Sequence, residues 1–381
     1  MPEHGQKIVH IAKVTGVHGM EKHLLTLLPR LNNQPHEIVF LILIDPQHPV
    51  ADYLELLKQQ GITTHPVTIH HDIDPFCFAA VFKFFRHVKP VLVHTHLMHG
   101  DLYGITAARC AGIKAIISSK HNDDAFRLRQ PLKIINYMLN RNTSRIIAIS
   151  DWIARFTQNV EGAAQEKIRT IYYGIEPAQT ASDRNALRAA LSMGSEDIVV
   201  GIIARLVEQK GHRYLIDAFA KAVMENYRLR LLIVGSGALE EELKKQVQRE
   251  SLQEKVIFTG YRSDTVDLLN AIDIFAHPSL WEGFGLSVLE AMTMGKPVVA
   301  TKVSALPELI EDTVTGYLVP PRDVTALSDA LLKLAGTPSL RQQMGASGQK
   351  RCRSLFSVDR MVQETRSLYT EVLASQTGLC Q

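Results

Sequence analysis

The feature that most constrains the fold is an alternation of short apolar runs with helical stretches, which occurs in two series along the chain. The first series contains predicted strands at 7–14, 36–45 and 91–96 and predicted helices at 19–31, 50–61 and 75–90. A second series begins with a predicted strand at 197–206. Such alternation is typical of parallel sheets that helices cover on both faces.

Two series imply two domains, and a chain of 381 residues is long enough for two hydrophobic cores. The expected fold is α/β, with two doubly wound, Rossmann-like domains facing a central cleft. We expect a first domain at 1–176, a polar linker at 177–196, a second domain at 197–356, and a final helix at 357–381 that packs back on the first domain. Ligands of parallel α/β sheets bind outside the carboxyl ends of the strands, so the site is expected there.

Composition argues against several classes of function. The formal net charge of +3 is too small to indicate nucleic-acid binding. Four scattered cysteines without a C-x-x-C pair favour a reducing compartment over disulfides or structural zinc. No stretch approaches about 18 consecutive apolar residues, so a cytoplasmic protein is expected. The Phe-rich helix at 75–90 either covers the sheet or makes a peripheral contact with the inner face of a membrane through Lys83, Arg86 and Lys89.

Two cations follow the first predicted strand of the second domain. Arg205 lies just beyond that strand, and Lys210 follows five residues later, before a glycine and a helix. A planar guanidinium fork and a compact ammonium on one loop suit a diphosphate. The other interpretation is two solvated surface charges.

The next two strand ends of this domain carry weaker signals. Gly235 and Gly237 form a turn between a strand and a helix, and a lone G-x-G often serves only that geometry. Tyr261 and Arg262 follow the third strand, where the backbone is free to contact a flat base. These positions are candidates for donor binding.

The stretch at 277–301 places two carboxylates eight residues apart. Glu282 lies in a Gly/Pro/aromatic loop, where it can reach a hydroxylated ligand. Glu290 lies in an apolar helix, where an unpartnered carboxylate is costly and a vicinal diol such as a ribose would satisfy it. Gly285 lets the backbone approach a ligand, and the helix that starts near Leu286 offers free amides to phosphate oxygens.

In order and spacing, Arg205…Lys210 and Glu282-x7-Glu290 around a Gly-Phe-Gly turn resemble the retaining glycosyltransferases of family 4, also called group 1, which have the GT-B fold. The resemblance is strongest over 197–320. It implies that Arg205 and Lys210 bind the diphosphate and stabilise it as leaving group. It also implies that Glu282 holds hydroxyls of the donor sugar and Glu290 those of the ribose.

The resemblance extends the site to further residues. The amides of Phe284, Gly285 and Leu286 would contact sugar and phosphate. In the first domain, Gly16 and Gly19 would lie near the diphosphate, and His121 beside the transferred sugar, although the family usually has adjacent glycines. Tyr173 stands where the family has Asn, which leaves a side-chain role at that position open.

Acceptor-side candidates are also in the first domain. His94 and His96 lie on one face of a strand end, where hydrogen-bonding roles are favoured over a metal because no carboxylate or cysteine ligand accompanies them. Arg127 and Arg129 could hold an anionic acceptor such as a lipid-linked sugar, or could be plain surface.

The resemblance therefore predicts a retaining, metal-independent transferase with no cofactor. It would move a hexose or N-acetylhexosamine from a nucleotide-diphosphate sugar, with a UDP-sugar favoured over a GDP-sugar, to a hydroxyl of a glycan or lipid-linked acceptor in polysaccharide or glycolipid biosynthesis. A GT-B-fold nucleotide-sugar 2-epimerase and a non-catalytic nucleotide-sugar-binding protein remain alternatives. An NAD enzyme is disfavoured, because no full G-x-G-x-x-G with a following acidic residue is present.

Overall fold

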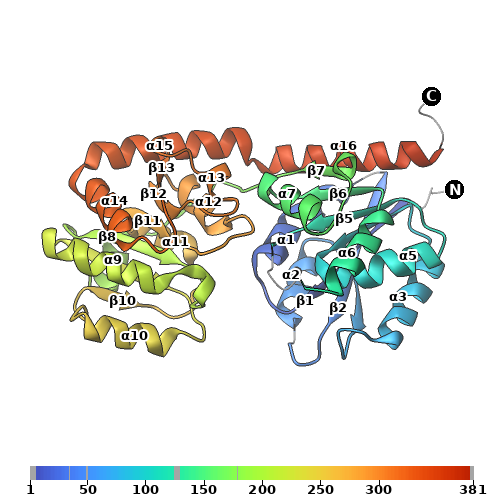
Figure 1. Cartoon of the computed structure of the whole chain (residues 1–381), viewed down its shortest axis with the longest axis horizontal. Helices are drawn as coiled ribbons and strands as arrows, with labels where there is room; N and C mark the ends of the chain where they lie inside the picture. The colour runs from blue at the N-terminus through green and yellow to red at the C-terminus, as the bar shows by residue number, and fades with distance from the viewer. Residues whose placement is uncertain (1–5, 34, 49, 124–128, 178, 378–381) are drawn as a thin grey trace. The chain divides into compact units, whose positions relative to one another are not determined.

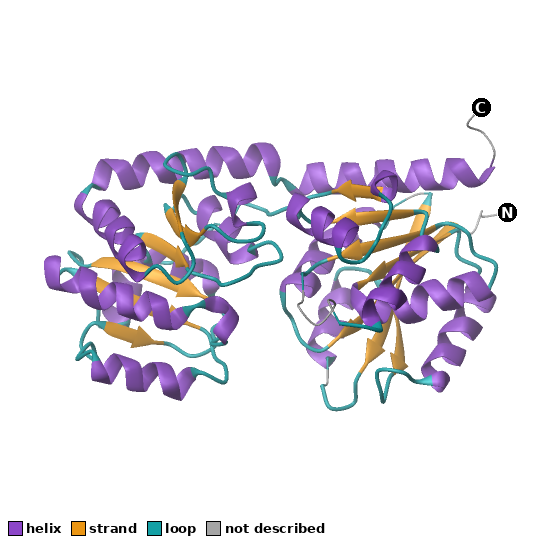
Figure 2. Ribbon diagram, viewed as in Figure 1, coloured by secondary structure: helices purple, strands orange, loops and turns teal. Residues whose placement is uncertain are grey.

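The computed structural model describes residues 6–33, 35–48, 50–123, 129–177 and 179–377. The chain forms two compact units (Figure 1). Unit 1 comprises Met1–Gly174 together with Val358–Gln381, and unit 2 comprises Ile175–Ser357. Each unit is a parallel sheet covered by helices on both faces (Figure 2), so the expected pair of doubly wound α/β domains is confirmed.

Unit 1 is built on a seven-stranded sheet in the order β3-β2-β1-β4-β5-β6-β7. Its strands are β1 (Gln6–Val14), β2 (His36–Ile44), β3 (Thr63–Thr68), β4 (Leu92–His96), β5 (Ile116–Lys120), β6 (Arg145–Ala148) and β7 (Ile168–Thr170). All neighbouring strands pair in parallel. The strand order reverses between β1 and β4, which makes their carboxyl ends the expected place for a ligand.

Helices cover both faces of this sheet. They are α1 (Gly19–Leu31), α2 (Ala51–Gln59), α3 (Pro75–Val88), α4 (Leu97–Gly100), the π-turn η1 (Asp101–Ile105), α5 (Thr106–Cys110), α6 (Leu132–Arg141), α7 (Asp151–Asn159), the 3-10 turn η3 (Gln165–Lys167) and α16 (Val358–Thr377). Helix α3 shows how local sequence sets these limits. The Asp74 carboxylate caps it by accepting hydrogen bonds from the amides of Phe76 and Cys77 at 2.9 and 3.1 Å, and Pro75 occupies its first turn.

The last helix, α16, belongs to unit 1. Its buried side chains Met361, Leu368 and Val372 share one hydrophobic core with Leu24 and Leu28 of α1. The final segment thus packs beside the first helix of the chain. A residue more than 300 positions from the start can therefore take part in the core of the first sheet.

Unit 2 is built on a six-stranded parallel sheet in the order β10-β9-β8-β11-β12-β13. Its strands are β8 (Ile198–Ile203), β9 (Leu229–Val234), β10 (Val256–Phe258), β11 (Ile274–His277), β12 (Val298–Thr301) and β13 (Gly316–Val319). Its helices are α8 (Arg184–Ala190), the 3-10 turn η4 (Glu208–Lys210), α9 (His212–Glu225), α10 (Glu240–Arg249), α11 (Thr265–Ala271), α12 (Leu286–Thr293), α13 (Leu306–Leu309), α14 (Val324–Gly336) and α15 (Pro338–Leu355).

The segment expected as a linker, 177–196, lies within unit 2 and contains α8. Arg188 on this helix is only 3% exposed. Its guanidinium donates to the Ala271 carbonyl at 2.8 Å and to the Asp273 carboxylate at 2.5 Å. A buried, charge-assisted contact of this kind fastens the segment to the sheet. In the part of the chain that the structure describes, no helix is both long enough and apolar enough to cross a membrane.

Candidate active site

Three loops meet at the carboxyl edge of the unit 2 sheet. The loop after β8 is tied to the loop after β9 by the Leu206 amide, which donates to the Ser236 carbonyl at 2.9 Å. The Gly235 amide in turn donates to the Gly260 carbonyl, beyond β10, at 2.9 Å. A Cβ at Gly235 would lie 2.0 Å from the Ala204 carbonyl oxygen, and its φ of +137° also favours glycine. The G-x-G at 235–237 therefore serves this close approach of loops.

A buried cluster of charged and polar side chains lies at the same edge. The Lys210 ammonium is 2.5 Å from Oε2 of Glu282, and Nε2 of His277 is 2.9 Å from the same oxygen. Ser279 Oγ lies 3.1 Å from that His277 nitrogen. The Glu282 amide donates to Ser304 Oγ at 3.2 Å, which fixes the loop that carries the carboxylate. Two residues that the sequence assigned to different parts of a donor are thus ion-paired.

Electrostatics keep the Glu282 carboxylate charged. Burial by itself raises the pKa of Glu282, but the positive charge of Lys210 and the hydrogen bond from His277 outweigh it and hold that pKa well below its usual range. Burial lowers the pKa of His277, so its imidazole is neutral at physiological pH and donates from Nε2 to the carboxylate. The site therefore presents one cation and one anion, both held in place before any ligand arrives.

Gly211 brings this cluster together. It has a φ of +66°, and a Cβ there would lie 2.0 Å from the Pro278 carbonyl oxygen. The loop of Gln209 is also joined to the loop after β11, because the Leu280 amide donates to the Gln209 carbonyl at 2.7 Å. Only glycine lets the two loops approach this closely while Lys210 points at Glu282.

Helix α12 begins directly after this loop. Its N-cap, Gly285, has a φ of +105°, a conformation that glycine adopts without strain. The first amides of a helix lack intrahelical acceptors, so those at Leu286 can bind an anion. Phe284 is 2% exposed and packs edge-on against Phe356 at 6.0 Å between ring centroids, so its side chain is part of the core of unit 2. Glu290 is half-buried, one turn further along α12.

The remaining unit 2 candidates differ in exposure. Arg205 is exposed on the loop after β8, three residues before η4 begins. Tyr261 is 74% exposed. Arg262 makes a two-pronged ion pair with Asp264, at 2.7 and 2.5 Å, so its guanidinium is already engaged within its own loop. Arg205 and Tyr261 are thus the candidates with accessible side chains.

In unit 1, seven side chains are joined end to end by hydrogen bonds. In order, they are Ser119, His94, Tyr369, His10, His96, His121 and Tyr173. We call this set the histidine chain. Every member is buried, and the set draws on β1, β4, β5, the loop after β7 and α16.

The first half of the histidine chain runs from β5 to β1 through the C-terminal helix α16. Ser119 Oγ is 2.7 Å from Nε2 of His94, whose Nδ1 is 2.6 Å from the Tyr369 hydroxyl. The same hydroxyl lies 3.0 Å from Nε2 of His10. Tyr369 is therefore the link between two histidines on neighbouring strands.

The second half runs outward along the carboxyl edge. Nδ1 of His10 is 2.9 Å from Nε2 of His96, and Nδ1 of His96 is 3.0 Å from Nε2 of His121. Nδ1 of His121 is hydrogen-bonded to the Tyr173 hydroxyl. The histidine that the resemblance places beside the transferred sugar thus has both ring nitrogens engaged inside unit 1.

Burial keeps several members of the histidine chain uncharged. It lowers the pKa of His10 to about 3, with a further contribution from His23, and lowers those of His94 and His96 well below their ordinary value. It also raises the pKa of Tyr369 well above its ordinary value. These groups are therefore neutral between about pH 6 and pH 8.

His10, His94 and His96 have ligand atoms within 4.8 Å of one another, close enough for a metal site. Each of their six ring nitrogens already has a hydrogen-bond partner within the histidine chain. The structure therefore accounts for the cluster as a neutral hydrogen-bonded group, the role that the sequence favoured for His94 and His96.

Other unit 1 candidates lie at loops. Gly16 follows β1, and Gly19 is the first residue of α1, so both lie at the carboxyl edge of the first strand. Arg129 is exposed just before α6. Arg127 lies outside the described residues.

Several residues of these sites have no signal in the sequence. Tyr369 is 359 residues from His10, and nothing local marks it as a partner. Lys120 is also unmarked, yet it forms a buried ion-pair triad with Asp101 at 2.7 Å and Glu161 at 3.2 Å. A single histidine in the apolar run at 7–14 was a usable hint for His10, because a polar residue buried in a central strand needs a partner.

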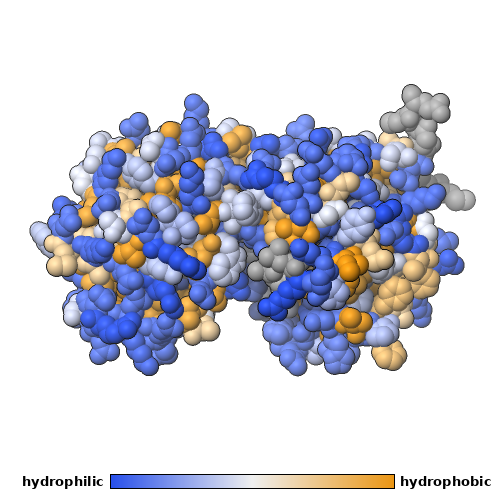
Figure 3. Space-filling model, viewed as in Figure 1, coloured by the Kyte–Doolittle hydropathy of each residue, from blue (hydrophilic) through white to orange (hydrophobic). Residues whose placement is uncertain are grey.

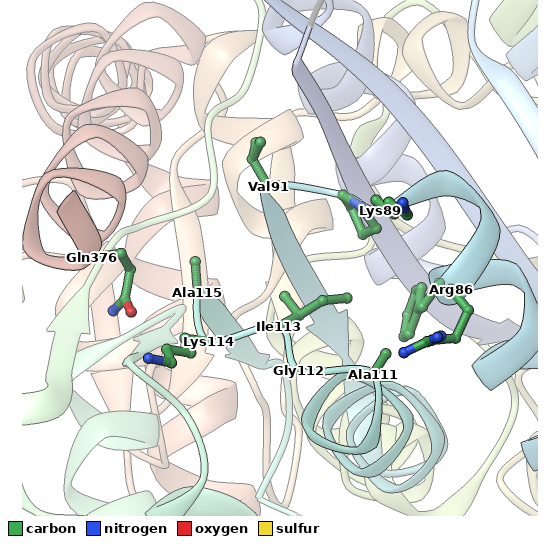
Figure 4. A pocket seen from close by; sticks show the side chains of 11 residues that line it. Arg86, Lys89, Val91, Ala111, Gly112, Ile113, Lys114, Ala115 and Gln376 are labelled. Atoms are coloured by element: carbon green, nitrogen blue, oxygen red, sulfur yellow. The ribbon is translucent and has the colours of Figure 1, made fainter.

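A pocket of about 370 Å³ lies elsewhere in unit 1. Arg86, Lys89 and Lys114 stand around it, beside the segments that lead into β4 and β5 (Figure 4). These are the amino ends of the strands, whereas ligands of doubly wound sheets bind at the carboxyl ends. The pocket is therefore separate from the histidine chain.

Comparison with protein families gives two matches that together span most of the chain. The model described as "Glycosyltransferase Family 4" matches residues 17–179, and the model described as "Glycosyl transferases group 1" matches residues 183–351. The first match lies in unit 1 and enters unit 2 by a few residues, and the second lies within unit 2.

Among characterised relatives, the chain is 25% identical to an Escherichia coli UDP-Gal:alpha-D-GlcNAc-diphosphoundecaprenol alpha-1,3-galactosyltransferase, over 97% of this chain and 98% of the relative. It is 24% identical to the Staphylococcus aureus capsular polysaccharide biosynthesis glycosyltransferase CapM, over 98% and 99% of the two chains. Among solved structures, Anabaena HepE in complex with UDP-glucose superposes with a TM-score of 0.84 at 25% identity, over 97% of this chain and all of HepE.

Proposed function

The chain belongs to the group 1 glycosyltransferases of the GT-B fold, and on that premise we propose that it moves a hexose or N-acetylhexosamine from a nucleotide-diphosphate sugar to a hydroxyl of a glycan or lipid-linked acceptor. The observation that carries this proposal is the Lys210–Glu282 pair at the carboxyl edge of unit 2, directly before the start of α12. It offers a cation for a leaving diphosphate and a carboxylate for sugar hydroxyls, next to amides that can bind phosphate.

A UDP-sugar is the donor we propose. HepE, which shares the fold over nearly the whole chain, was solved with UDP-glucose, and the Escherichia coli relative is named for UDP-Gal. Glu290 on α12 would accept hydrogen bonds from the ribose hydroxyls, and the exposed Tyr261 and Arg205 would meet the base and diphosphate.

We further propose that transfer retains the anomeric configuration and needs no metal. The donor phosphate oxygen would accept the proton of the acceptor hydroxyl on the face from which the diphosphate leaves. Lys210, Arg205 and the first amides of α12 would then stabilise the charge that develops on the diphosphate. The anomeric configuration of the product, determined in the presence of a chelator, tests both statements.

Donor binding can be tested by thermal unfolding with UDP, GDP, ADP and their common sugars. A ligand present at a hundredfold excess over its Kd stabilises the native state by about 2.7 kcal/mol, so one nucleotide should raise the Tm of the wild-type protein. Glu290→Ala should abolish the shift for that nucleotide, because the ribose loses its acceptor. Glu241→Ala, which removes an exposed carboxylate on α10, serves as the control and should keep the shift. Stabilisation that survives in Glu290→Ala would contradict the assignment of the ribose to this residue.

A lipid-linked acceptor would explain the outer face of α6. Ile134, Tyr137 and Met138 on this helix are 55%, 45% and 60% exposed, and hydrophobic side chains are visible over this part of unit 1 (Figures 1 and 3). Arg129, exposed just before α6, would add a positive charge for an anionic head group. Helix α3 is less suited, because Phe85 is buried against the sheet and Phe76 is its one largely exposed phenylalanine among the described residues. We therefore propose that α6 makes the peripheral contact with lipid.

This contact predicts measurable vesicle binding. The double variant Ile134→Ser/Met138→Ser should bind phosphatidylglycerol vesicles at least about tenfold more weakly than wild type, since each apolar side chain contributes about 1.5–3 kcal/mol when buried. The matched control is Met224→Ser/Tyr227→Ser, which removes two side chains of unit 2 that are 88% and 78% exposed. Co-sedimentation measures both. Equal binding by the two double variants would refute a role for α6.

A further inference from the structure

The histidine chain has a property that follows from counting its protons. It contains seven groups and six hydrogen bonds. A hydroxyl or a neutral imidazole carries one proton to donate, and its other lone pair can accept. Each hydrogen bond uses one proton. Each of the six hydrogen bonds receives one proton only if all groups donate in the same direction along the set. If the direction of donation changed at any group, one hydrogen bond would contain two protons or none.

A single direction fixes the tautomers. If donation runs toward Tyr173, all four histidines carry their proton on Nδ1. If it runs toward Ser119, all four carry it on Nε2. The tautomers of the four imidazoles are therefore coupled, although the four residues lie on three different strands or strand ends. The count holds for neutral imidazoles, and burial lowers the pKa of His10, His94 and His96, which keeps these three neutral.

Ser119 sets the direction. It is 2% exposed, and within the described residues His94 is the one hydrogen-bond partner of its hydroxyl. If His94 donated to Ser119, the serine proton would be buried without an acceptor, which costs about 1–3 kcal/mol. If Ser119 donates to Nε2 of His94, each proton in the chain has an acceptor.

The other end supports the same direction. Donation toward Tyr173 makes its oxygen the acceptor of the His121 Nδ1–H, so the tyrosine keeps its own proton for a further group. The Glu21 carboxylate on α1, which is 4% exposed, is close enough to raise the pKa of Tyr173 beyond the effect of burial. A hydroxyl proton beside a buried carboxylate is stabilised when it points toward negative charge.

We propose that the histidine chain is one polarised unit with all four imidazoles protonated on Nδ1, and that Tyr369 of the C-terminal helix is a positioning residue that fixes the Tyr173 hydroxyl as a hydrogen-bond donor. Its relevance to sugar transfer rests on the proposed function, because the resemblance places His121 beside the transferred sugar. Tyr173, where the family has Asn, then becomes the group that this chain presents in place of His121.

The tautomers can be measured directly by ¹⁵N NMR of the full chain labelled at its histidines, since the two ring nitrogens differ in shift according to which one carries the proton. Resonances of the four histidines of the histidine chain are assigned by through-bond correlation of each imidazole with its own backbone, which leaves the hydrogen-bonded set intact. We expect all four to be Nδ1–H between about pH 6 and pH 8, opposite to the Nε2–H form that a free imidazole prefers. A proton on Nε2 of any of the four, or a charge gained in this range, would overturn the proposal.

Tyr369→Phe provides the perturbation. It keeps the ring but removes the acceptor of the His94 Nδ1–H, so His94 should move to the Nε2–H form and donate to Ser119. The matched control is Tyr103→Phe, which also removes a buried hydroxyl with two hydrogen bonds in unit 1, to the Asp74 amide at 2.6 Å and to the Asp72 carbonyl at 3.0 Å. That variant should leave all four tautomers unchanged. An unaltered His94 in Tyr369→Phe would contradict the coupling.

Addition of Zn²⁺ separates this arrangement from a metal site. The ¹⁵N shifts of the four histidines should not change, since every ring nitrogen already has a hydrogen-bond partner. A change in shift that EDTA reverses would show that the cluster binds a metal and would refute the proposed hydrogen-bonded unit. None of these measurements needs a donor or an acceptor. A failure of the proposed transferase activity would therefore leave them unaffected, and a failure of the tautomer pattern would leave the unit 2 site unaffected.

Discussion

Lys210→Met should lower the kcat of sugar transfer by about 10²–10³-fold, the effect of removing one group that stabilises developing negative charge. The ammonium lies at the carboxyl edge of the unit 2 sheet, 2.5 Å from Glu282 and held there by the close approach of Gly211 to Pro278. A methionine of similar length keeps the apolar stem and removes only the charge. Initial rates with the nucleotide sugar identified by thermal unfolding provide the measurement.

Loss of the charge also leaves the Glu282 carboxylate with a neutral histidine and a serine, so some loss of stability is expected. The double variant Lys210→Met/Glu282→Gln separates the two effects, because it removes the unpaired anion and should recover stability without recovering transfer. Arg213→Met, which breaks the exposed pair with Glu242 on the same unit, is the control and should transfer at the wild-type rate. Transfer by Lys210→Met within threefold of wild type would exclude Lys210 from the reaction.

The elements of the fold were accessible from sequence because their signals are local. The helix expected at 19–31 is observed at Gly19–Leu31, and the strand expected at 91–96 at Leu92–His96. Between α4 and α5, by contrast, the helical path is interrupted by a π-turn at Asp101–Ile105. There Gly100 and Gly104 press against β1, with a Cβ at either position 2.6 Å from atoms of Ile11. Glycines in a sequence do not reveal which backbone will approach them.

The candidate site also contains residues with local sequence signals and contacts that only the fold determines. Spacing alone brought Arg205, Lys210, Glu282 and Glu290 to attention, because each follows a strand end or lies on the helix after it. The ion pair between Lys210 and Glu282 was not predictable, since it depends on how two loops 72 residues apart meet. His121 was identified through a resemblance, but its partners come from β4 and from Tyr173 and could be found only in the folded chain.

The largest effect on stability should come from Lys120, which the sequence did not mark. Its ammonium lies 2.7 Å from Asp101 and 3.2 Å from Glu161, and all three side chains are 1% exposed. Thr95 and Ser118 donate to the same Asp101 oxygen at 2.5 and 2.6 Å, so the aspartate has further partners. Lys120→Met would leave two carboxylates buried without their cation. We expect the free energy of unfolding of unit 1 to fall by about 3–5 kcal/mol.

The two tryptophans make this measurable unit by unit, because Trp152 lies in unit 1 and Trp281 in unit 2. In a Trp281→Phe background, urea unfolding followed by fluorescence reports unit 1. Lys7→Met is the control, because it removes a lysine of the same unit whose ion pair with Glu37, at 3.8 Å, is exposed. It should lower the free energy of unfolding of unit 1 by less than about 1 kcal/mol.

A compensated variant then identifies the cause. Lys120→Met/Asp101→Asn/Glu161→Gln replaces the triad by neutral groups of similar size, and the amide oxygen at position 101 can still accept from Thr95 and Ser118. Removing a whole buried charge cluster is far less costly than removing one partner. Most of the lost stability should therefore return in the triple variant. If the triple variant is as unstable as Lys120→Met, the loss comes from packing of the lysine stem and not from the two carboxylates that have lost the Lys120 cation.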